Sequence, residues 1–298
     1  MLNNENKDQS SKKPVISFYA KEKMLCPVCK KSFAREEMLS GGGRMIAGDL
    51  TDELHRQYEP SAKYGKIYPL LYNIAACPHC HVALFLSDFN NLLEADADKI
   101  MADMDERIKS VETIFPHYRL DRERNLLDGA AMYYLALLSY EKTSPSFSPT
   151  IKKAIISLRL AWLCGYLNEE CPGHNYDYIQ QVFYRKAMFL YQQALEYETN
   201  STESIAGITN FGPDIDKNYG YDGVVYLCGL LEYKFGQTED KTLRIKKLDE
   251  HKRAIARIFG LGKSSKAKPG PLLEHSRNLY DSLSKELKDA SFIDLSDE

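Results

Sequence analysis

Two short cysteine pairs constrain this chain more than any other feature of its sequence. They read CPVC over residues 26–29 and CPHC over residues 77–80. Two residues between the cysteines let one tight turn direct both thiolates at the same ion, and the proline after the first cysteine stiffens that turn. Zn²⁺ prefers four such donors in a tetrahedron. We therefore expect one structural zinc ion per chain, held by Cys26, Cys29, Cys77 and Cys80.

Four thiolates would leave no open coordination position, so the ion would stabilise the fold and activate no water. The 47-residue insertion between the pairs, residues 30–76, is tolerable because the entropy cost of closing a loop grows only logarithmically with its length. Strand-like residues flank both pairs, which predicts a zinc ribbon. His79 and His81 are possible replacement ligands, although four cysteines are already available.

A CPHC pair also occurs in thiol oxidoreductases, where the first cysteine begins a helix and has a lowered pKa. Here VALFL follows the pair and is typical of a buried strand. The redox interpretation therefore stays open as an alternative, and the metal site is favoured.

The chain changes character near residue 90, which predicts an α+β protein that is mostly α. Residues 15–89 read as a β-rich zinc-ribbon domain, with a possible short helix at 51–58. Residues 90–289 read as an all-α domain, in which apolar residues recur at helical spacing from Ile100 to Ile114 and Asp128 is the expected N-cap of the next helix. Residues 1–14 form a polar tail that we expect to be disordered, and residues 290–298 an acidic tail.

Further helices are expected at 151–166, 177–198, 221–235, 239–259 and 271–289. They repeat weakly, because LCGYL at 163–167 returns as LCGLL at 227–231. Small and large residues also alternate in the same way at two places, Ala154, Leu158 and Ala161, and Ala187, Tyr191 and Ala194. This spacing predicts tetratricopeptide-like helix pairs, with an irregular helical bundle as the alternative.

The 298 residues carry a formal net charge of −3, which by itself indicates no polyanionic partner. Residues 241–268 are the exception, since ten Lys/Arg against two acids give this stretch a charge of +8. It could contact nucleic acid, although one side of it is apolar and fits a packed helix. With no apolar signal segment and no run near the ~20 residues of a membrane span, we expect a cytoplasmic protein without membrane contact.

Several other residues are weaker candidates for chemistry. The glycines of residues 41–44 could offer amides to an anion, but they lack the lysine and hydroxyl of a phosphate-binding loop. His55 lies near three acids in the sequence and could act as an acid or base or bind a second metal. We expect Trp162 to pack between helices and the three remaining cysteines to be small apolar residues without a catalytic role. Cys164 and Cys228 should be buried, and Cys171 buried or near the surface.

The order of motifs resembles the bacterial family called "domain of unknown function 2225". The resemblance rests on LCPVC, YPLLYNIAACPHC, DRERNLLDGAAMYYLALLSYE, LRLAWLCGYL and YLCGLLEYKFG, and it omits only the polar tail and the last helix. It implies a cytoplasmic protein with a metal-binding ribbon and a tetratricopeptide-like region, whose ligands correspond to the four cysteines of the two pairs. Where the family usually has glycine after the second pair, this chain has His81.

Together these features favour a non-enzymatic interaction protein that binds a protein or peptide on its helical surface. No nucleophile and base accompany the closed metal site, and stacked helix pairs offer a concave surface. The alternatives are a nucleic-acid-associated ribbon that uses residues 241–268, and a CPHC thiol oxidoreductase.

Overall fold

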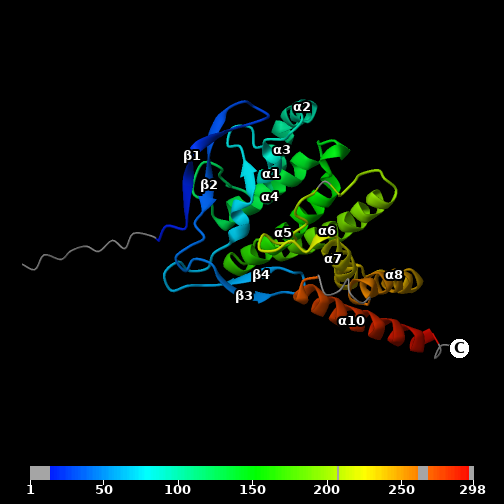
Figure 1. Cartoon of the computed structure of the whole chain (residues 1–298). Helices are drawn as coiled ribbons and strands as arrows, with labels where there is room; N and C mark the ends of the chain where they lie inside the picture. Colours follow the sequence, from blue (N-terminus) through cyan, green and yellow to red (C-terminus); the bar gives the residue numbers. More distant parts are fainter. Residues whose placement is uncertain (1–13, 207, 261–267, 295–298) are drawn as a thin grey trace, which may run out of the picture.

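The computed structural model confirms an α+β fold that is mostly α (Figure 1). It describes residues 14–206, 208–260 and 268–294. The expected N-terminal tail therefore lies almost wholly outside the described residues, as does the end of the acidic tail. Part of the basic stretch, residues 261–267, also lies outside them.

The strands form three antiparallel hairpins rather than one sheet. Two of these hairpins, β1–β2 and β5–β6, carry a cysteine pair at the turn, and the third, β3–β4, belongs to the insertion between the pairs. The bounds are β1 Ser17–Leu25, β2 Ser32–Met38, β3 Ile46–Leu50, β4 Arg56–Glu59, β5 Ile74–Ala76 and β6 Ala83–Phe85.

Helices follow the last strand at once, and the described elements after it are all helical. The α-helices are α1 Leu86–Phe89, α2 Glu94–Ala102, α3 Met104–Ile114, α4 Leu126–Tyr140, α5 Pro149–Glu170, α6 Tyr176–Thr199, α7 Gly220–Phe235, α8 Lys241–Phe259 and α10 Gly270–Asp294. Two short 3-10 helices, η1 Pro69–Tyr72 and η2 Pro145–Phe147, precede β5 and α5.

Helix α4 is the central helix that its apolar sequence predicts, since twelve of its fifteen residues are buried. Its N-cap is Asn125, not Asp128, because the Asn125 side chain accepts the Asp128 amide at 2.8 Å. The Asp128 carboxylate is buried and accepts from Arg122 and from the Arg119 amide instead. The cap lies three residues earlier because Asn125 caps the helix, while the loop just before the helix supplies Asp128 with these partners.

Two local predictions are wrong. The helical stripe from Ile100 to Ile114 is divided between α2 and α3, which meet at Asp103. Residues 51–58 form a turn and then β4, not a short helix, and Leu54 has a left-handed backbone with φ 58°. Strand pairing with β3 decides this segment, because eight residues are too few to form a stable helix by themselves.

Helices α5 and α6 are joined by only five residues and contact each other along their lengths. The two recurring glycines of the LCG motifs both face the next helix. A Cβ at Gly165 would meet Gln180 of α6, and a Cβ at Gly229 would meet Ile255 of α8. The glycines therefore permit close approach in both helix pairs, while the tetratricopeptide-like interpretation stays a prediction.

One hydrophobic core runs from the cysteine turns to the last helix. It includes Cys26, Phe33 and Leu84 from the strand region as well as residues of α4 to α10, such as Leu135 and Leu283. The core thus crosses the expected boundary at residues 89 and 90, and the division into two domains stays a prediction.

Gly129 of α4 tests how tightly this core is packed. A Cβ there would collide with the buried side chain of Leu71 in η1. We expect Gly129→Val to destabilise the protein by about 2 kcal/mol through overpacking, measured by urea unfolding. Leu71→Ala opens the same space. The double variant should therefore lose less free energy of unfolding than the two single variants lose together. Strict additivity would contradict the contact.

Candidate metal centre

The two cysteine pairs sit in turns of the same geometry. The amide of the first cysteine donates to the carbonyl five residues on, from Cys26 to Lys31 and from Cys77 to Val82, at 3.0 and 2.9 Å. The residue after the second cysteine is left-handed in both turns, with φ 59° at Lys30 and 57° at His81. The turn is therefore a local structure that the chain forms twice.

These turns bring all four thiols into one group, whose sulfur atoms lie within 4.8 Å of one another. Cys26 Sγ lies 3.6 Å from Cys80 Sγ, and Cys29 Sγ lies 3.7 Å from Cys77 Sγ. A tetrahedron of sulfur atoms about 2.3 Å from a central ion has edges of about 3.8 Å. All four cysteines are free thiols, so the spacing fits metal ligands and not disulfides.

Without a cation, the four thiols cannot all be ionised at once. Hydrogen bonds from Cys77 and Cys80 lower the pKa of Cys26 to about 2, while the same contact with Cys26 raises the pKa of Cys77 to about 12. The pKa of Cys80 is raised further for the same reason. A divalent cation would offset the repulsion between neighbouring thiolates and let all four cysteines ionise. The group could therefore hold a metal ion.

Arg107 of α3 ties the second turn to the helices. Its guanidinium is fully buried and donates from Nη2 to the Cys80 carbonyl at 2.9 Å and from Nη1 to the Ile100 carbonyl at 2.7 Å. His81 is bound beside it, with Nδ1 2.6 Å from the Tyr118 hydroxyl. Among the described residues the metal-binding group contains only the four cysteines, so the structure brings neither His79 nor His81 into it.

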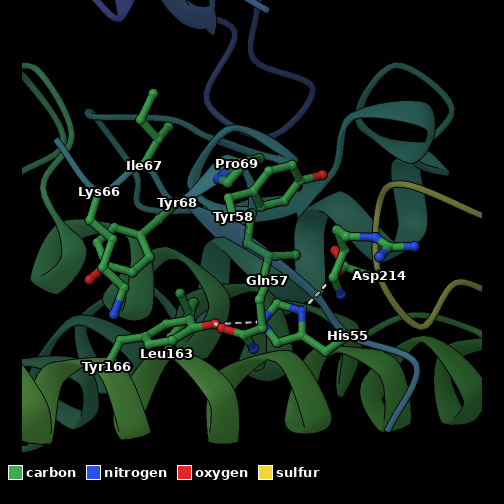
Figure 2. Close-up of a pocket in the computed structure, with 12 residues that line it drawn as sticks. His55, Gln57, Tyr58, Lys66, Ile67, Tyr68, Pro69, Leu163, Tyr166 and Asp214 are labelled. Carbon is green, nitrogen blue, oxygen red and sulfur yellow. Dashed lines mark hydrogen bonds and ion pairs between the residues drawn. The ribbon is translucent and has the colours of Figure 1, made fainter. Parts of the chain in front are cut away.

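A second buried group forms around His55, the histidine of the insertion. The sequence suggested nearby acids as its partners, but its partner is Asp214, 159 residues along the chain. Figure 2 shows His55 between Asp214 and Tyr166, whose hydroxyl lies 2.7 Å from Nε2. The ring also stacks on Trp162 with centroids 4.0 Å apart. No signal in the sequence singles out Asp214, because only the fold brings its loop to the hairpin.

Glu53 extends this group toward α6 and α7. Its carboxylate accepts from Trp162 Nε1 at 2.6 Å, from the Tyr184 hydroxyl at 2.9 Å and from Lys234 Nζ at 3.0 Å. Trp162 therefore packs between helices, as expected, and also holds the insertion. The β3–β4 hairpin is thus fixed to α5, α6 and α7 by side chains that are largely buried.

The His55 group is better suited to a structural role than to catalysis. Burial acts to raise the pKa of Asp214, but the hydrogen bond and charge of His55, together with the Ile215 amide and Arg159, hold it below its usual value. Burial raises the pKa of Tyr166 to about 12, which keeps the phenol protonated. The cavity in Figure 2 is about 20 Å³, room for one water. A more open pocket of about 220 Å³ is lined by His55, Trp162 and Tyr184. Among the described residues, no serine, threonine or cysteine side chain hydrogen-bonds the His55 ring.

The other candidates have ordinary surroundings. The glycine-rich turn at 41–44 places Arg44 against the Tyr64 ring and the Gly41 carbonyl, so its own side chain fills the loop. Burial raises the pKa of Cys164 and of Cys228 to about 12, while Cys171 is exposed at the end of α5.

The basic stretch is partly neutralised in the structure. The residues of this stretch that form ion pairs with neighbouring acids are Arg244, Lys247, Arg253 and Lys268. Within the described chain, none of the helices is both long and apolar enough to cross a bilayer.

The structure defines the class of this protein, which is mostly helical with a small strand region and a four-cysteine group. The sequence profile of the family described as "Uncharacterized protein conserved in bacteria (DUF2225)" matches residues 19–283, and the chain belongs to this family. A relative from Borreliella burgdorferi, described as "Uncharacterized protein", is 43 % identical over 274 residues, which cover 92 % of this chain and 98 % of that protein. No solved structure matches.

The His55–Asp214 pair predicts a particular dependence of stability on pH. Because the folded-state pKa of Asp214 is lowered, its contribution is present at neutral pH and is lost as the pH falls below about 4. We expect Asp214→Asn to lower the free energy of unfolding by about 2 kcal/mol at pH 7. The difference from wild type should shrink in acid, as measured by urea unfolding between pH 3 and 7.

Asp216→Asn is the matched control, since Asp216 lies on the same loop and pairs with Arg56 near the surface. We expect it to cost less than about 1 kcal/mol. Equal effects of the two substitutions at every pH would contradict the assigned role of Asp214.

Proposed function

We propose that this chain is a zinc-stabilised protein-interaction protein, in which the four cysteines hold one Zn²⁺ and the exposed face of α6 binds a protein partner. The donor set supports zinc, since four thiolates in a closed tetrahedron are typical of structural zinc sites. The ion would cross-link the two turns and would take no part in catalysis. The compartment that we propose is the cytoplasm, where thiols stay reduced.

The observation that carries the interaction proposal is an apolar stripe on α6 that nothing in the described chain covers. Tyr178 is 70 % exposed, Val182 43 % and Phe189 58 %. The opposite face of α6 is buried against α5 and α7. Arg185 lies within the stripe, is exposed, and has no carboxylate within 4 Å among the described residues.

The spacing of the stripe indicates what kind of partner it would bind. Tyr178, Val182, Arg185 and Phe189 are separated by four, three and four residues. This is the spacing with which one helix packs along another. Aromatic residues and arginine are also the types enriched in protein interfaces. We therefore expect an amphipathic helix that offers apolar residues to the stripe and an acid to Arg185.

The two other functions stay predictions without a specific observation in their favour. The ion pairs of α8 leave less free positive charge for nucleic acid than the sequence suggests. For the redox alternative, the CPHC pair is followed by β6 and not directly by a helix.

Elemental analysis of the purified chain tests the metal proposal. We expect one zinc per chain, and Cys77→Ser should lower both the zinc content and the melting temperature because it removes one of four ligands. Cys171→Ser is the matched control and should keep the zinc, since Cys171 lies outside the group. Metal-free protein with free thiols and an unchanged melting temperature would contradict the proposal, as would thiol turnover in an insulin-reduction assay.

Affinity capture from the source cells tests the α6 surface. We expect Phe189→Ala and Arg185→Glu each to weaken the captured complex by about tenfold or more, with unchanged melting temperatures because both residues are exposed. Tyr221→Ala removes an equally exposed aromatic residue on α7 and should have no effect. Exchanging an acid for lysine in the partner helix should restore binding to Arg185→Glu.

Capture that neither substitution weakens would overturn the assignment of α6. Sedimentation of the purified chain gives the second check. A dimer that Phe189→Ala dissociates would show that the stripe is used between copies of this chain, which also contradicts an adaptor role.

A further inference from the structure

A cavity of about 440 Å³ lies between the end of β6, the first turns of α5 and the loop that precedes α7. Its volume falls in the range of small-molecule sites. It contains no residue of the four-cysteine group or of the α6 stripe, so the proposed function does not use it. Two cations line it, Arg159 and Lys152 of α5, which lie on the same helix face two turns apart.

Arg159 is the unusual member of this lining. Its side chain is only 4 % exposed, yet no carboxylate of the described residues lies within 4 Å of its guanidinium. Nε donates to the Pro213 carbonyl and Nη1 to Asn73 Oδ1, both at 2.6 Å. A buried charge without an ion partner is costly unless a ligand supplies the opposite charge.

The acids closest to this cation are already engaged. Asp88 accepts from Lys152 Nζ at 2.7 Å and from the Tyr140 hydroxyl at 2.5 Å. Asp214 accepts from His55 and from the Arg56 amide. The Lys152–Asp88 pair therefore cancels, and the charge that still acts on Arg159 is that of Asp214, which His55 shares.

The lining offers hydrogen-bond donors that no other group uses. The Oδ1 atom of Asn73 is used by Arg159 and that of Asn210 by the Gly212 amide, so each asparagine has its NH₂ group left for a ligand. Lys152 has further protons to donate. The apolar residues of the lining are Phe85, Leu86, Ile155, Ile208 and Ile215, and three further polar residues also line it, Ser87, Asn91 and Thr209.

We propose that this cavity binds a small organic anion, with its carboxylate or phosphate on Arg159, Lys152 and the asparagine amides. Its apolar part lies against Phe85 and the isoleucines. The volume of the cavity suits a small ligand. The site is separate from the metal centre, so its test does not depend on the proposed function.

Calorimetric titration of the full chain with three ligands of equal chain length tests this site. The probes are hexanoate, hexyl phosphate and hexanol. We expect one molecule of hexanoate or hexyl phosphate to bind per chain, and whichever binds more tightly identifies the head group. Hexanol should bind at least about tenfold more weakly, because it lacks the charge that pairs with Arg159.

Substitutions then locate the binding. Lys152→Gln should weaken anion binding by about tenfold, whereas Lys153→Gln removes the same charge from the next residue of α5, outside the lining, and should leave binding unchanged. Ile208→Trp should abolish binding by filling the cavity with no change of charge. Circular dichroism verifies that each variant is folded.

Three results would overturn the proposal. They are no binding of either anion, hexanol binding as tightly as hexanoate, and equal weakening by Lys152→Gln and Lys153→Gln. Equal weakening by the two substitutions would show that the overall positive charge of α5 attracts the anion and that the anion does not bind in the cavity.

Discussion

The structure depends on the meeting of two cysteine turns that lie about fifty residues apart in the chain. Each turn is stiffened by proline and closed by its own backbone hydrogen bonds, so its two thiols are positioned before the turns meet. Their meeting buries sulfur atoms at spacings that suit one ion. Arg107 then fixes the second turn to α2 and α3, which links this junction to the helices.

The insertion between the cysteine pairs is fixed at both ends. Its ends form the cysteine hairpins, and its middle hairpin is bound to α5, α6 and α7 through Glu53 and His55. The two junctions explain why one core crosses the expected domain boundary. A long insertion that makes such contacts loses the freedom of a loop, and its ordering is coupled to the packing of the helices.

The second cysteine turn also connects the four-cysteine group with the large cavity. Strand β6 leaves the turn at Val82 and ends at Phe85, whose ring lies 5.4 Å from the Arg159 guanidinium carbon. The exposed stripe of α6 begins just after the five residues that follow α5. Helix α5 is therefore the shared element, since it holds Trp162 and Arg159 and packs along the length of α6.

The sequence by itself determined the features that depend on neighbouring residues. These are the two cysteine turns, the apolar α4, most helix ends and the α+β class, because short-range spacing and proline decide them. The His81 backbone is left-handed, and its ring contacts the Tyr118 hydroxyl, a partner that no local pattern reveals. Only the tertiary structure gave His55 its partner Asp214 and buried Arg159 with no carboxylate of the described residues within 4 Å. The physical reason is that a buried polar group takes whichever partner packing brings within hydrogen-bond distance, at any separation along the chain.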